Sequence, residues 1–295
     1  MIFLILAVLA FLLQNLCCKE FGRRFPETIA MQCVMVAVST LIVAAIMAAT
    51  GGMHWLRSGE WGVAAAFGFW FVVTLASMTL AINYGHMGIT LLIQNSSLIV
   101  PTLYSVAVWG ERFTLPKAAG TACILAMLAL SALGGGSAGA DEATQRRWNR
   151  RLWIIFTALA FTGDSMLSIL QGYMALGSSG STTFTLWTSL FSAAFAALLY
   201  LLTRRRQPGA LRAARGQPKP FWLYCAGIGV GTAGGNSLSI VALTMLPGII
   251  LYPLRQGSVV LLMWFAGVLL YHEKVNRTGW WMLATGIAGM VLLNL

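Results

Sequence analysis

Charged side chains are scarce in this chain of 295 residues: they make up 9% of the sequence, and only eight of them are acidic. An average soluble protein carries about 25% charged residues. Hydrophobic residues account for 58% of the chain, which is more apolar surface than one core could hide. The composition therefore excludes an ordinary soluble protein and predicts that lipid is the solvent for much of the chain.

Cysteine and histidine are also few, with five and three residues. The cysteines all fall in or beside apolar runs, and no pair has the spacing of metal ligands. Buried thiols of this kind behave as small hydrophobic groups. We therefore expect no disulfide, no metal site and no resident cofactor.

Signatures of catalysis and of nucleic-acid binding are missing as well. The sequence has no nucleophile elbow, no phosphate-binding loop and no dinucleotide fingerprint. Five glycines between Gly227 and Gly235 lie inside an apolar run, where small residues let helices approach closely. The formal charge of +11 comes from bases in connecting loops that contain no nucleic-acid-binding motif. We expect neither an enzyme nor a primary pump, and no nucleic-acid partner.

Long apolar runs are what the sequence has in abundance. A membrane-spanning helix needs about 20 mainly apolar residues, and ten segments meet this requirement. They are 2–18, 28–49, 61–84, 87–109, 115–133, 152–176, 182–203, 221–245, 248–271 and 277–295. The predicted fold class is an all-α membrane protein with ten transmembrane helices.

One stretch of the sequence is written twice, in residues 88–133 and again in 250–295, at a displacement of 162 positions. The aligned positions include polar ones: Gln94 with Gln256, Ser96 with Ser258, and Glu111 with Glu273. Internal duplication in so apolar a chain is typical of transporters. We place a first five-helix repeat at 1–140, a linker at 141–151 and a second five-helix repeat at 152–295. Because each repeat has an odd number of spans, the two repeats are expected to be inverted.

Lys and Arg are unevenly divided between the two sides of this ten-span arrangement. Fifteen lie in the loops of one side, three lie on the other, and Arg255 falls within a span. By the positive-inside rule, the side with fifteen bases is cytoplasmic. The linker is therefore expected in the cytoplasm and both termini outside it.

The ten spans, the two repeats and an acidic residue at the end of the fourth span of each repeat resemble the ten-helix EamA-like branch of the drug/metabolite transporter superfamily. The matching segments read WGERFTLPKAAG from Trp109 and YHEKVNRTG from Tyr271, where His272 stands in place of the usual glycine. The resemblance covers essentially the whole chain. It implies a carrier of the inner (cytoplasmic) membrane with a central cavity between the repeats, and it implies no particular substrate.

Two charged residues, Asp164 and Arg255, lie inside predicted spans and away from the first turn at either end, where a charge costs roughly 3 kcal/mol or more. Asp164 lies about halfway along the sixth span, and we interpret it as a substrate or proton site; the alternative is a structural acid. Arg255 would bind a substrate carboxylate or phosphate, pair with Asp164, or reach the outer interface. Pro253 and Gly257 flank Arg255 and weaken its helix, so we expect a stronger helix interruption here than at the matching segment 92–97.

The other cavity candidates are uncharged. Amides suit a wall that faces an uncharged or zwitterionic solute, although they equally suit hydrogen bonds between helices. Aromatic rings can hold an ammonium group through cation–π attraction. The residues assigned to the central cavity besides Asp164 and Arg255 are Gln94, Asn95, Gln256, Gln14, Asn15, Tyr104, Trp187 and Trp264. Glu111 and Glu273 are expected to be structural at the ends of their helices, with gating pairs to neighbouring bases as the alternative.

Together these features favour a secondary active or facilitative transporter of a small polar metabolite, amino-acid-like or an aromatic amine, working by alternating access. One alternative is a multidrug or quaternary-amine (choline-like) transporter that relies on the rings and Asp164. A remote alternative is a membrane enzyme or lipid scramblase. The expected partners are the small-molecule substrate and the lipid bilayer, and proton coupling through Asp164 is left open.

Overall fold

The computed structural model describes residues 2–25, 28–51, 54–84, 90, 93–111, 114–135, 150–176, 180–204, 210, 214, 216–271 and 277–293. Every regular element in these ranges is a helix. The expected linker lies almost wholly outside the described residues, as does Glu273. The all-α class predicted from the sequence is confirmed.

Ten α-helices and one short 3-10 helix occur in the described residues. They are α1 (Ile2–Arg24), α2 (Ile29–Gly51), α3 (Trp61–Tyr84), η1 (Ser96–Leu98), α5 (Ile99–Trp109), α6 (Leu115–Gly135), α8 (Arg150–Leu176), α9 (Ser181–Thr203), α11 (Pro218–Leu243), α12 (Gly248–Tyr271) and α13 (Arg277–Leu293). Seven of those described are long and apolar enough to cross a membrane: α1, α2, α3, α8, α9, α11 and α12. The chain is a multi-pass membrane protein.

Helix ends follow the local sequence. Arg23 and Arg24 lie in the last turn of α1, where the partial negative charge of a helix C-terminus favours bases. Pro218 opens α11 at a position where its missing N–H costs nothing. Gly110 closes α5 in the left-handed conformation, at φ 66°, which glycine adopts without strain. The end of α5 at Trp109 agrees with the expected limit, whereas α1 runs six residues beyond its expected end at 18 and α11 starts three residues before its expected start at 221.

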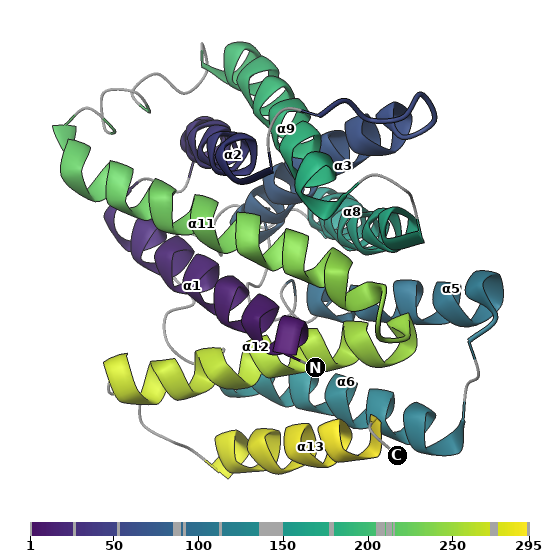
Figure 1. Ribbon diagram of the computed structural model, residues 1–295. Helices are drawn as coiled ribbons and strands as arrows, with labels where there is room; N and C mark the ends of the chain where they lie inside the picture. The colour runs from purple at the N-terminus through teal and green to yellow at the C-terminus, as the bar shows by residue number, and fades with distance from the viewer. Residues whose placement is uncertain are drawn as a thin grey trace. The chain divides into compact units, whose positions relative to one another are not determined.

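The chain forms two compact units. Unit 1 consists of Met1–Thr79 and Leu170–Thr244 and so contains α1, α2, most of α3, α9 and α11. In this unit α1 runs along α11, and α2 packs against both α9 and α11 (Figure 1). A cluster of Phe rings, Phe21, Phe25 and Phe221, holds the ends of α1 and α11 together.

Unit 2 consists of Leu80–Ile169 and Met245–Leu295 and contains η1, α5, α6, most of α8, α12 and α13. Here α6 and α13 lie side by side, and α12 packs on α5, α6 and α13 (Figure 1). Glycine permits a close approach of α6 and α13: a Cβ added to Gly289 would lie 3.0 Å from the carbonyl oxygen of Gly120. Small residues at such crossings are typical of membrane helices.

The sequence analysis expected the stronger helix interruption near Arg255, and this expectation is wrong. α12 is continuous, with Pro253 inside it, whereas the 3-10 segment occurs in the first repeat at Ser96–Leu98. One proline removes a single backbone N–H, which a membrane helix tolerates. Small polar side chains instead offer the backbone alternative hydrogen bonds, and Ser165 of α8 donates such a bond to the carbonyl of Ser97 in this turn.

Candidate functional site

Asp164 lies at the middle of α8 and is hydrogen-bonded to the 3-10 turn in unit 2. The hydroxyl of Ser97 donates to the Asp164 carboxylate Oδ2. The next residue on α8, Ser165, donates to the carbonyl of Ser97 at 3.3 Å and to its own helix at Phe161. Ser97 and Ser165 are buried. Asp164 therefore binds the side chain of Ser97 in the turn, and Ser165 binds its backbone carbonyl.

Arg255 on α12 belongs to the same cluster. It is half-buried and interacts electrostatically with Asp164 and with Tyr252. Tyr252 is itself fully buried, and its hydroxyl donates to the carbonyl of Ser168 at 3.1 Å. The structure thus brings the two ionisable residues singled out from the sequence into one cluster. An acid and a base that attract one another lower the cost of placing either charge in a membrane helix.

An amide pair bridges the two halves of the sequence in this cluster. Nε2 of Gln256 donates to Oδ1 of Asn95 at 2.7 Å. Both side chains are half-buried, and so is that of Gln94, one residue earlier. The bridge joins α12 to the chain just before η1, next to the hydrogen bond that Ser97 makes with Asp164. The polar cluster of unit 2 is defined here as Asn95, Ser97, Asp164, Arg255 and Gln256.

Glu111 caps a helix that is distant in the sequence. Its two carboxylate oxygens accept hydrogen bonds from the backbone N–H groups of Gly248, at 2.7 Å, and Ile249, at 2.8 Å. These N–H groups open α12, and an anion at a helix N-terminus satisfies unpaired donors and complements the helix dipole. Glu111 therefore fixes the start of α12, the helix that carries Arg255 and Gln256.

Replacing Glu111 is expected to destabilise the protein. Glu111→Ala removes two hydrogen bonds to a charged group, so thermal unfolding in detergent is expected to show a loss of about 2–4 kcal/mol. Glu111→Gln keeps one acceptor and is expected to lose about half as much. Glu60→Ala is the matched control, because the Glu60 side chain accepts a backbone hydrogen bond at an exposed position. Equal effects at Glu60 and Glu111 would contradict the capping role.

The three aromatic candidates lie in different surroundings. Tyr104 contacts Trp109 at the end of α5, with ring centroids 5.6 Å apart. Trp264 packs against α13, where its ring fills the space beside Gly279. Trp187 belongs to unit 1: its Nε1 donates to the carbonyl of His54, and its ring contacts two further tryptophans near helix ends, Trp55 and Trp61.

Gln14 and Asn15 also belong to unit 1. Asn15 is exposed, and its amide donates to the carbonyl of Phe11 on its own helix at 2.7 Å. Gln14 is half-buried against α11, where a Cβ added to Gly231 would lie 2.8 Å from the Cβ of Gln14. Its Oε1 is buried and has no hydrogen-bond partner among the described residues. A buried acceptor of this kind favours a donor from a solute or a water.

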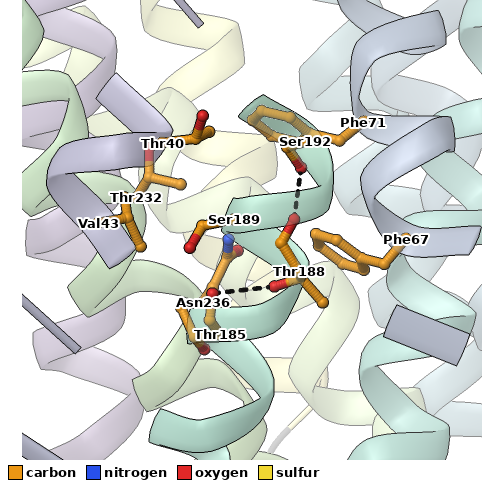
Figure 2. Close-up of a pocket in the computed structure, with 10 residues that line it drawn as sticks. All are labelled: Thr40, Val43, Phe67, Phe71, Thr185, Thr188, Ser189, Ser192, Thr232 and Asn236. Carbon is orange, nitrogen blue, oxygen red and sulfur yellow. Dashed lines mark hydrogen bonds between the residues drawn. The ribbon is translucent and has the colours of Figure 1, made fainter. Parts of the chain in front are cut away.

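Unit 1 also contains a pocket that the sequence interpretation missed. It is lined by α2, α3, α9 and α11 through Thr40, Val43, Phe67, Phe71, Thr185, Thr188, Ser189, Ser192, Thr232 and Asn236 (Figure 2). The pocket is small, with room for about one water molecule. Its signal was present: residues 185, 188, 189 and 192 are all Ser or Thr, a spacing that puts them on one helical face.

Comparisons with known proteins show the fold. No family model and no curated protein matches the chain. Among solved structures 28 chains match, including one described only as "Crystal structure of protein", with 15% sequence identity and a TM-score of 0.74. That match covers 99% of this chain and 94% of the other. The fold and the apolar helices define the class as a multi-pass, all-α membrane protein.

Proposed function

We propose that this protein is a secondary active or facilitative transporter that moves a small polar metabolite by alternating access. The observation that carries the proposal is Asp164, an acid at the middle of a span-length helix, bonded to a 3-10 turn and attracted to Arg255. Ionisable residues inside membrane helices are rare and mark solute or ion pathways. A 3-10 turn within an apolar segment is typical of a hinge.

The helix contacts support ten spans in two inverted five-helix repeats. Numbered within each repeat, the second helices (α2 and α9), the fourth (α5 and α12) and the fifth (α6 and α13) each pack on their own counterpart. In unit 1, the third helices contact the second helices of the opposite repeat at glycines. A Cβ at Gly68 of α3 would lie 2.8 Å from the Ser192 nitrogen of α9, and one at Gly229 of α11 would lie 2.9 Å from the Ser39 oxygen of α2.

The chemistry of the polar cluster of unit 2 favours an amino-acid-like solute or another small zwitterion. Asp164 offers an acceptor for an ammonium group, Arg255 offers a donor fork for a carboxylate, and Gln256 offers an amide. A choline-like substrate would instead need rings arranged around an opening. Around Trp187 the rings contact one another, with centroids 4.7 and 5.3 Å apart, and so do not favour that alternative.

The proposed location is the cytoplasmic membrane, with both termini outside the cytoplasm. Fifteen bases on one side against three on the other support this orientation. Because moving basic segments across a membrane is disfavoured, the linker between the repeats would face the cytoplasm.

A screen of the purified protein tests the function. Thermal unfolding in detergent is measured against a library of amino acids, amines, nucleotide sugars and quaternary ammonium compounds, because a ligand of the folded state raises the unfolding temperature. Each stabilising compound is then supplied in radiolabelled form to proteoliposomes. We expect saturable uptake of a small zwitterion. Stabilisation only by quaternary amines would favour the alternative carrier, and turnover of a lipid without uptake would overturn transport.

A further inference from the structure

We propose that the pocket of unit 1 is a sodium-binding site. Its lining offers six buried hydroxyl groups drawn from three helices. They are Thr40 on α2, Thr185, Thr188, Ser189 and Ser192 on α9, and Thr232 on α11. The pocket contains no acidic or basic side chain. Such a lining is unusual in an apolar helix bundle, where buried polar atoms are costly unless they have partners.

The direction of the hydroxyl hydrogen bonds determines what the pocket can bind. Five of the six hydroxyls donate their proton to a backbone carbonyl of their own helix: Thr40 to Val36, Thr188 to Thr185, Ser189 to Leu186, Ser192 to Thr188, and Thr232 to Ile228. The sixth, Thr185, accepts from Ser237 at 3.0 Å. A hydroxyl has one proton and two lone pairs. Those five oxygens therefore have lone pairs left, and the pocket is rich in acceptors.

Acceptor-rich, oxygen-lined sites bind hard cations, whose hydration shell the oxygens replace. The absence of a carboxylate from this lining disfavours Ca²⁺ and Mg²⁺, which are held through ligand charge. Space for about one water molecule excludes an organic ammonium compound and fits one dehydrated monovalent ion. Phe67 and Phe71 close one side with rings that can also attract a cation (Figure 2).

Asn236 is anchored at the edge of the pocket. Its Oδ1 accepts from Nε2 of Gln171 at 2.9 Å, and Gln171 is buried. This bond ties α11 to the end of α8, so an ion drawn to the α11 side of the pocket would also order the helix that carries Asp164. On the assumption of the proposed function, the sodium ion would be the coupling ion of the carrier.

Thermal unfolding tests the site without any need for transport. The unfolding temperature of the purified chain is measured in NaCl, KCl and N-methylglucamine chloride at equal ionic strength. We expect a rise of about 3 °C or more that is specific to Na⁺. The variant Ser189→Ala/Ser192→Ala removes two of the acceptor oxygens and is expected to weaken the apparent affinity for Na⁺ at least tenfold. If that variant does not fold, Thr40→Val/Thr232→Val removes two others with little change of shape.

Thr203→Ala is the matched control, because Thr203 lies on α9 outside the pocket and also donates to its own helix, at 2.8 Å to Leu199. It is expected to keep the full response to Na⁺. Equal unfolding temperatures in all three salts would mean that the pocket holds only water, and a sodium response unchanged in both pocket variants would place the ion elsewhere. Either result overturns the site. A sodium response without uptake of any solute would overturn the proposed transport and leave the site standing.

Discussion

Asp164→Asn is expected to reduce solute uptake into proteoliposomes at least tenfold while the protein still folds. Asparagine keeps an oxygen that accepts the hydrogen bond from Ser97, so the turn at η1 stays held. It loses the negative charge, which is the feature that would attract an ammonium group or carry a proton. A tenfold change corresponds to about 1.4 kcal/mol, which is modest for one charge in a site of low dielectric constant. Initial uptake rates over a range of substrate concentrations measure the effect.

Two further variants separate a functional acid from a structural one. Thr157→Val lies on the same helix and removes a buried hydroxyl that has no hydrogen-bond partner in the described structure, so uptake is expected to be unchanged. The double variant Asp164→Asn/Arg255→Gln removes both charges. If the acid served only to neutralise Arg255, the double variant would recover uptake that the single variant had lost. Recovery would therefore contradict a direct role for Asp164.

The fold was readable from the sequence because lipid imposes a simple rule on it. Backbone polar groups in a membrane need partners within the protein, and a helix supplies them within one segment, so long apolar runs become helices. Each of the ten expected segments overlaps one of the described α-helices, and the end of α3 at Tyr84 and the start of α12 at Gly248 agree with the expected limits. The stronger helix interruption was expected near Arg255 and not at Ser96–Leu98. The sequence could not show that Ser165 of α8 bonds the Ser97 carbonyl of this 3-10 turn, because the two residues are 68 positions apart.

The candidate site was readable from the sequence only in part, because charged residues stand out in an apolar run and hydroxyl groups do not. Charge in an apolar run is conspicuous, so Asp164 and Arg255 stood out, and the structure places them in one cluster. Hydroxyl groups are not conspicuous, because Ser and Thr bond to their own helix and cost little in a membrane. The pocket of unit 1 was therefore missed. The partner of Glu111 was also beyond the sequence, since its carboxylate bonds a helix start 137 positions away.

Gly68→Leu is expected to have the largest effect on stability, enough to prevent recovery of folded protein. An added Cβ would lie 2.6 Å from the Phe191 Cβ and 2.8 Å from the Ser192 nitrogen, so the backbone of α9 would have to move. Overpacking of a core side chain costs typically 1–3 kcal/mol, and a clash with backbone cannot be relieved by a change of rotamer. Size-exclusion chromatography and thermal unfolding measure the loss.

Gly62→Leu is the matched control on the same helix, where a Cβ meets nothing within 4 Å. Leucine favours a helix over glycine, so this variant is expected to fold normally or to be slightly more stable. Gly229→Leu on α11 is expected to behave like Gly68→Leu, because its Cβ would lie 2.9 Å from the carbonyl oxygen of Ser39 on α2. If Gly68 tolerates leucine and Gly229 does not, the crossing of α3 with α9 and that of α11 with α2 are not equivalent. The proposed inverted repeat would then lose one of the contact patterns that support it.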